Sequence, residues 1–203
     1  MSEPRSMRPE LLEAIARKTI KSFDPRLLTD TTKEIPIEDI IERLGISLEY
    51  QYIRKDGRIL GETIFSDCHI PLYNMDQKKY ELVFIPRGTI IIDASLLEQG
   101  NNGRLRFTCA HELAHWLIHQ ELYGPGAVGH DIDYIITKSS DVDQRIERQA
   151  DILASALLMP INMVKRSFYR IAGNDDIKTK SLAEEFCVSR QAMEIRLREH
   201  RLI

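Results

Sequence analysis

The sequence predicts an α+β fold in which a small three-stranded sheet packs on a bundle of helices. Two stretches near the N-terminus, residues 8–23 and 36–44, have the apolar periodicity of amphipathic helices. Three β-prone stretches follow between residues 46 and 93, and helical patterns then continue to the C-terminus. Strands and helices do not alternate, so the order of elements gives no indication of a parallel sheet.

The expected strands are rich in β-branched and aromatic residues, and turn-forming residues separate them. They span residues 46–53, 62–73 and 81–93. The last stretch ends in Thr-Ile-Ile-Ile-Asp at residues 89–93. This run is apolar and β-branched, so we expect it to lie inside the sheet or to line a groove at its edge.

The second half of the chain is expected to be mainly helical. A loop around Gly103 leads into a helix that contains residues 107–120. Residues 121–143 are rich in Gly, Asp and Ser and are expected to be irregular. A helix over residues 143–159 ends at Pro160, and further helices follow it.

The composition is that of a soluble globular protein of 203 residues, with 43% hydrophobic and 29% charged residues. A net charge of −3 excludes attraction of the whole chain to nucleic acid or to an anionic membrane. The three cysteines form no CxxC pair, which favours free thiols in a reducing compartment. No apolar run approaches the roughly 20 residues needed to span a bilayer. We therefore expect a cytoplasmic protein that has no contact with a membrane.

Residues 111–115 read His-Glu-Leu-Ala-His, which is an HExxH motif in a mostly apolar run. Residues four apart lie on one face of a helix, so His111 and His115 can bind one ion. Glu112 can then reach a metal-bound water without being a ligand itself. The alternative is a buried helix with two hydrogen-bonded histidines, because a catalytic zinc site also needs a third protein ligand.

His119 is not expected to be this third ligand. Its Cα lies roughly 12 Å along the helix axis from that of His111, and a straight helix cannot bring all three rings to one ion. Metzincins solve this problem with a Gly and a third His after the motif, but Ile118 and Glu121 occupy those positions here. We expect His119 to be structural or to support one of the ligands.

The helix over residues 143–159 supplies better candidates. Glu147 and Asp151 share one face, and Ala150 and Ala154 let a second helix approach closely. Glu147 is the expected third ligand, and Asp151 is expected to accept the free ring N–H of a ligating histidine, His111 in particular. The alternative is that both acidic residues lie on an ordinary charged surface.

The two segments HELAH (111–115) and ERQADILASALLMP (147–160) resemble the ImmA/IrrE family of zinc metallopeptidases. That family carries HExxH, then E-x-x-A-(N/D), small residues and LLMP, and Asp151 stands where the family often has Asn. The resemblance implies that His111, His115 and Glu147 bind Zn²⁺ and that Glu112 is the catalytic base.

The resemblance also implies a role, because family members often cleave helix-turn-helix transcriptional repressors. The expected partner is therefore a protein substrate, and we expect its peptide to add as a strand along residues 89–93. A donor must stabilise the oxyanion opposite the zinc. The candidates are Tyr123, His130, Tyr134 and Arg145.

The resemblance extends from about residue 36 to the C-terminus, and we expect the chain to have three parts. These are an N-terminal helical segment (1–35), a zinc metallopeptidase domain (36–172) and a C-terminal helical segment (173–203) packed on that domain.

The C-terminal segment has features of a helix-turn-helix. Ser181 and Glu184 are expected to form a capping box, and Ser189 is expected to cap a second helix. Acidic and basic side chains balance across residues 181–203, so the basic face that DNA binding needs is missing. Direct binding of nucleic acid is therefore not expected. The rival function is a regulatory module that binds protein or DNA and has a structural or vestigial zinc site.

Overall fold

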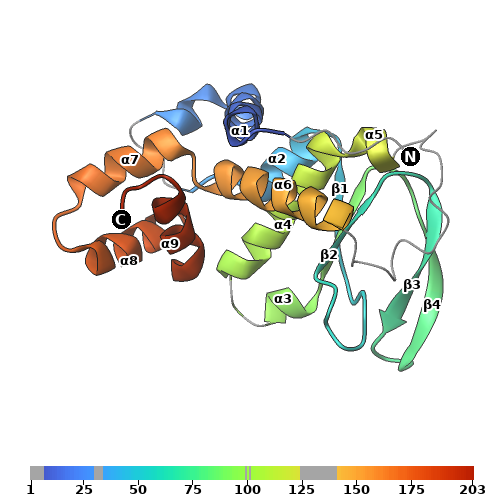
Figure 1. The fold of residues 1–203 in the computed structure, drawn as a ribbon. Coiled ribbons are helices and arrows are strands. Elements are labelled where there is room, and N and C mark those ends of the chain that lie inside the picture. The colour runs from blue at the N-terminus through green and yellow to red at the C-terminus, as the bar shows by residue number, and fades with distance from the viewer. Residues whose placement is uncertain (1–6, 30–33, 99, 101, 124–140) are drawn as a thin grey trace.

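The computed structural model describes residues 7–29, 34–98, 100, 102–123 and 141–203, and its fold is of the expected α+β class (Figure 1). The elements in chain order are α1 (Pro9–Phe23), a 3₁₀ helix (Pro25–Leu28), α2 (Ile37–Arg43), β1 (Ser47–Gln51), β2 (Gly61–Ile64), β3 (Cys68–Asn74), β4 (Lys79–Ile85), β5 (Thr89–Asp93), α3 (Ser95–Glu98), α4 (Asn102–Ile118), α5 (Gln120–Tyr123), α6 (Asp141–Leu158), α7 (Ile161–Arg170), α8 (Asp175–Glu185) and α9 (Arg190–Glu199).

The main sheet has three strands in the order β1-β5-β2. Strand β2 is antiparallel to β5, whereas β1 is parallel to it, with Ser47 opposite Thr89. The parallel pair is a departure from the sequence-based expectation. Two parallel neighbouring strands must be joined by a long crossover connection, which is usually a helix. Here the connection from β1 to β5 consists of β2, β3 and β4. The sequence therefore shows no alternation of strands and helices that would predict the parallel pair.

Two of the three expected β stretches each divide into two strands. Residues 62–73 contribute to β2 and β3, and residues 81–93 contribute to β4 and β5. Strands β3 and β4 form a separate antiparallel ribbon. Its apolar inner face packs on one side of the main sheet through a small core of Ile53, Ile64, Ile70, Leu72, Ile85 and Ile91.

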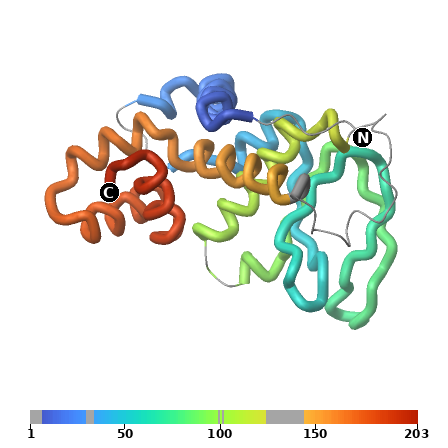
Figure 2. Tube along the Cα trace, viewed as in Figure 1, coloured from blue at the N-terminus to red at the C-terminus, as the bar shows by residue number. Residues whose placement is uncertain are grey.

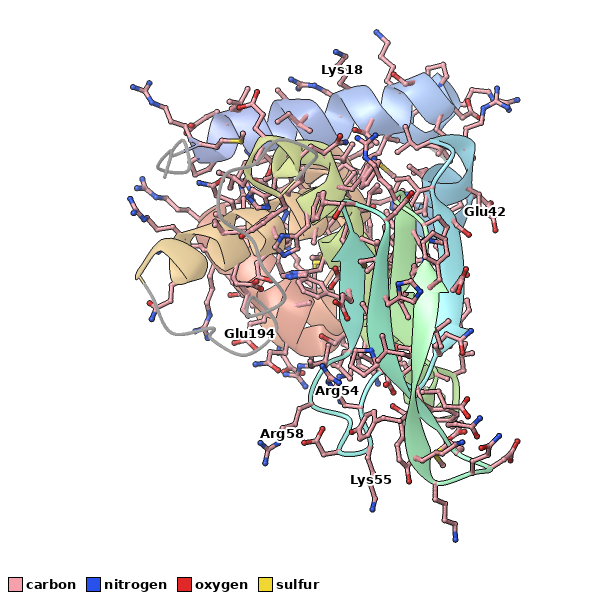
Figure 3. The ribbon with its side chains drawn as sticks, turned by 90° about the vertical axis from the view of Figure 1, so that its right-hand side faces the viewer. Lys18, Glu42, Arg54, Lys55, Arg58 and Glu194 are labelled. Carbon is pink, nitrogen blue, oxygen red and sulfur yellow. The ribbon has the colours of Figure 1, made fainter. Side chains whose placement is uncertain are left out.

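The other side of the main sheet faces the helices. Ile90 and Ile92 of β5 belong to the main hydrophobic core, together with Leu113 and Ala114 of α4. Figure 2 shows that α6 passes between α1 and α4, and both pack against it. Figure 3 shows the strands side-on beneath α1, whose Lys18 points away from the core. The HExxH helix is therefore held between the sheet and α6.

The start of α4 differs from the expected loop, since Gly103 lies in the first turn of the helix. A Cβ at Gly103 would be 2.9 Å from the backbone nitrogen of Ser189. The glycine is therefore explained by the close approach of the α8–α9 turn to α4 and not by a loop conformation. None of the helices in the described ranges is long and apolar enough to cross a lipid bilayer.

The last three helices gather at the end of the molecule away from the sheets (Figure 1). Arg196 of α9 is almost completely buried, donates two hydrogen bonds to the Met159 carbonyl and pairs with Glu13 of α1. Arg106 of α4 donates to the carbonyl of Cys187 in the α8–α9 turn. These contacts fix the C-terminal helices against α1, α4 and the end of α6.

The expected capping box at Ser181 is wrong, because α8 begins six residues earlier, at Asp175. The side chain of Asn174 accepts a hydrogen bond from the Ile177 N–H and is the N-cap. Ser181 consequently lies inside the helix. The second expected cap is confirmed, since Ser189 accepts a hydrogen bond from the Ala192 N–H at the start of α9.

Candidate metal centre

Helices α4 and α6 pack against each other through small residues. Ala110 and Ala114 of α4 and Ala150 and Ala154 of α6 are all completely buried. Side chains of this size let two helix backbones approach closely. The polar side chains on the facing surfaces are therefore brought within reach of one another.

Three of these side chains, those of His111, His115 and Glu147, form a compact group of donor atoms within 4.8 Å of one another. The two Nε2 atoms are 3.0 Å apart. The Glu147 carboxylate oxygens lie 3.2 Å from His111 Nε2 and 3.7 Å from His115 Nε2. Ligands of a tetrahedral zinc ion at about 2.0–2.1 Å are separated by about 3.3 Å. The spacing and the donor types of this group therefore fit a single Zn²⁺, which His111, His115 and Glu147 would hold.

Asp151 lies one helical turn after Glu147 and contacts His111 from the other side of its ring. Its Oδ1 is 2.9 Å from His111 Nδ1, so the imidazole can direct Nε2 toward the ion. Burial opposes a positive charge on His111, but hydrogen bonds to Asp151 and Glu147 outweigh it and raise its pKa to about 10. The two carboxylates thus make the centre attractive to a cation.

His119 lies outside this group of three and contacts the ring of His115. The two Nδ1 atoms are 3.0 Å apart, which leaves Nε2 of His115 for a metal. Burial lowers the pKa of His119 to about 4, and nearby Gln149 offsets part of this effect. No hydrogen bond of normal geometry reaches His119 Nε2 within the described part of the chain. A neutral His119 can accept the Nδ1–H of His115.

Glu112, the expected base, is buried and directed toward strand β2. The Thr63 hydroxyl is 2.7 Å from its carboxylate, and Gly61 faces the same side chain. Sequence reasoning missed both β2 residues. Thr63 carries no signal, whereas a glycine inside a strand is a sign of close approach by another group.

Two of the four expected oxyanion donors, Tyr123 and Arg145, lie in the described part of the chain. The Tyr123 ring is tilted against Phe65, with ring centroids 5.4 Å apart, and it lies edge-on to His119 at 6.5 Å. Arg145 is exposed on α6. His130 and Tyr134 lie outside the described residues. The oxyanion donor therefore stays a prediction.

The expectation that a peptide adds along residues 89–93 is wrong. These residues form β5, and its two edges are already hydrogen-bonded to β1 and β2. The run is apolar because it is the central strand, buried over its whole length. Among the described strands, β2 is the edge strand beside α4.

An HExxH motif on α4 and an acidic donor on α6 thus form a candidate metal centre between two helices. The family model described as IrrE N-terminal-like domain, of the M78 peptidases, matches residues 68–198. The chain belongs to this family, as its sequence motifs led us to expect. No curated protein matches the chain.

Proposed function

We propose that the protein is a zinc-dependent metalloendopeptidase whose metal ligands are His111, His115 and Glu147. The observation that carries the proposal is that one donor atom from each of the three residues lies within 4.8 Å of the others, close to the spacing of about 3.3 Å around one tetrahedral ion. A bound Zn²⁺ supplies a Lewis acid that lowers the pKa of water and polarises a carbonyl. Glu112 accepts the proton of the attacking water and passes it to the leaving amine nitrogen.

The substrate class follows from the family, whose members are peptidases. We propose a protein substrate, and a helix-turn-helix transcriptional repressor in particular. An extended segment of this substrate pairs with β2, because β2 is an edge strand and lies next to α4. We place the reaction in the cytoplasm, where free cysteines stay reduced.

We assign residues 36–172 to the peptidase domain and residues 173–203 to a segment that packs on it. The first helix, within residues 1–35, contacts both parts. Direct DNA binding by α8 and α9 is disfavoured because two exposed arginines of α9 are already paired with acids, Arg190 with Asp176 and Arg198 with Glu194. A phosphate would have to compete with these carboxylates.

Two measurements test the proposal, one on the purified protein and one in cells that express it. Metal analysis should find one zinc per chain in the wild type and in Glu112→Gln, and less in Glu147→Ala. Sequencing of protein N-termini in cells should reveal new termini with the wild type that are absent with Glu112→Gln. Identical sets of N-termini in cells that express the wild type and in cells that express Glu112→Gln would refute a peptidase that uses Glu112.

A further inference from the structure

Strand β2 makes a hydrogen bond to the expected catalytic base. Thr63 Oγ1 lies 2.7 Å from Glu112 Oε2 and 3.0 Å from the Glu112 carbonyl oxygen. An ionised carboxylate only accepts hydrogen bonds, so the hydroxyl is the donor, and its single hydrogen is shared between Oε2 and the carbonyl oxygen. The Glu112 carboxylate is thereby tied to an element 49 residues earlier in the chain.

Two residues before Thr63, on the same face of β2, Gly61 leaves space for the same carboxylate. A Cβ at this position would lie 2.7 Å from both Cγ and Oε1 of Glu112. Real side chains do not approach so closely, so any larger residue would move the glutamate. The φ of Gly61 is not positive, so no left-handed backbone conformation requires this glycine. The contact with Glu112 is thus its structural reason.

We propose that Gly61 and Thr63 are positioning residues that hold the Glu112 carboxylate in the place where it can accept a proton. This inference rests on the proposed function, in which Glu112 is the general base. Both residues precede the span matched by the family, which begins at residue 68. Their contacts therefore extend the active site to a strand that the family match does not include.

The physical reason is that a glutamate side chain has several rotatable bonds and must be restrained to act as a base. One hydrogen bond on Oε2 and a glycine beside Oε1 restrain both sides of the carboxylate. A displacement of about 1 Å in a reacting group can cost about a hundredfold in rate. Neither β2 residue contacts a metal ligand in the described interactions, so metal affinity should not change with them.

The first test needs no metal and no substrate. The protein is labelled with ¹³C at the glutamate carboxyl, and the Glu112 resonance is identified by its loss in Glu112→Gln. Thr63→Val and Gly61→Ala should each shift this resonance, and Thr63→Ser should leave it near the wild-type position. Thr108→Val is the matched control, because it removes a hydroxyl from α4 whose hydrogen bond, among the described residues, goes to the Arg104 carbonyl and not to Glu112. An unshifted resonance in Thr63→Val overturns the contact.

The second test measures the rate of cleavage with equal amounts of zinc-loaded protein. Cleavage is followed at a new N-terminus that the wild type produces and Glu112→Gln does not. Thr63→Val and Gly61→Ala should be slower by about tenfold to a hundredfold, with unchanged zinc affinity. Thr63→Ser and Thr108→Val should retain the wild-type rate. A shifted resonance with a wild-type rate overturns the positioning role. If the wild type itself produces no new termini, the proposed function fails, while the carboxyl resonance still decides whether β2 holds Glu112.

Discussion

Replacement of Asp151 by alanine is expected to weaken zinc binding by about tenfold. The Asp151 carboxylate is 2.9 Å from His111 Nδ1 and orients that ring toward the ion. A hydrogen bond to a charged group contributes about 1.5–3 kcal/mol. The Asp151 side chain is 57% exposed, so solvent screening places the effect at the lower end, about 1.5 kcal/mol. That free energy corresponds to about a tenfold change in the dissociation constant.

The assay is a titration of the metal-free protein with Zn²⁺ in competition with a chromophoric chelator. Asp151→Asn serves as the matched variant, because its amide oxygen can still accept the His111 N–H without a charge. Its affinity should fall between those of the wild type and Asp151→Ala. Equal affinity in all three proteins would refute the reasoning, since it would mean that this hydrogen bond does not orient a ligand.

The remaining predictions concern packing and pH. Ala154→Leu inserts a larger side chain between α4 and α6, so it should cost about 1–3 kcal/mol in thermal unfolding and reduce zinc content. Arg196→Met removes the buried ion pair with Glu13, which keeps only His200 at 3.5 Å, and the two hydrogen bonds to the Met159 carbonyl, so chemical denaturation should show a loss of about 3 kcal/mol. Burial and then Arg196 lower the pKa of His200, so its protonation favours unfolding, and stability falls as the pH drops below about 6.5. In His200→Gln, denaturation midpoints should decline less steeply over that range.

The parts of the fold that depend on local patterns could be predicted from the sequence. Apolar periodicity predicted α1, found at Pro9–Phe23, and α6, found at Asp141–Leu158 and expected from residue 143. Pro160 does follow the end of α6, as its missing N–H requires. These signals lie within a few residues of the elements that they specify.

The features that were missed depend on contacts between distant residues. The parallel pairing of β1 with β5 and the contact of Thr63 with Glu112 leave no mark in nearby residues. The apolar run at 89–93 was compatible with a central strand and with a strand that lines a groove at the sheet edge. The run is a central strand because β1 and β2 pair with its two edges, and the sequence of the run does not contain this information. Glu147 could be named as a candidate ligand from the sequence because two local signals point to it. It lies four residues before Asp151, on the same helix face, and small residues between and after the two acids let a second helix pack closely there.

Anomalous X-ray diffraction at the zinc absorption edge, from crystals of the zinc-loaded protein, tests the central claim most directly. We predict one anomalous peak at about 2.0–2.2 Å from His111 Nε2, His115 Nε2 and a Glu147 oxygen. A zinc peak that is bound by other residues, or one that the Glu147 carboxylate does not reach, would contradict the account.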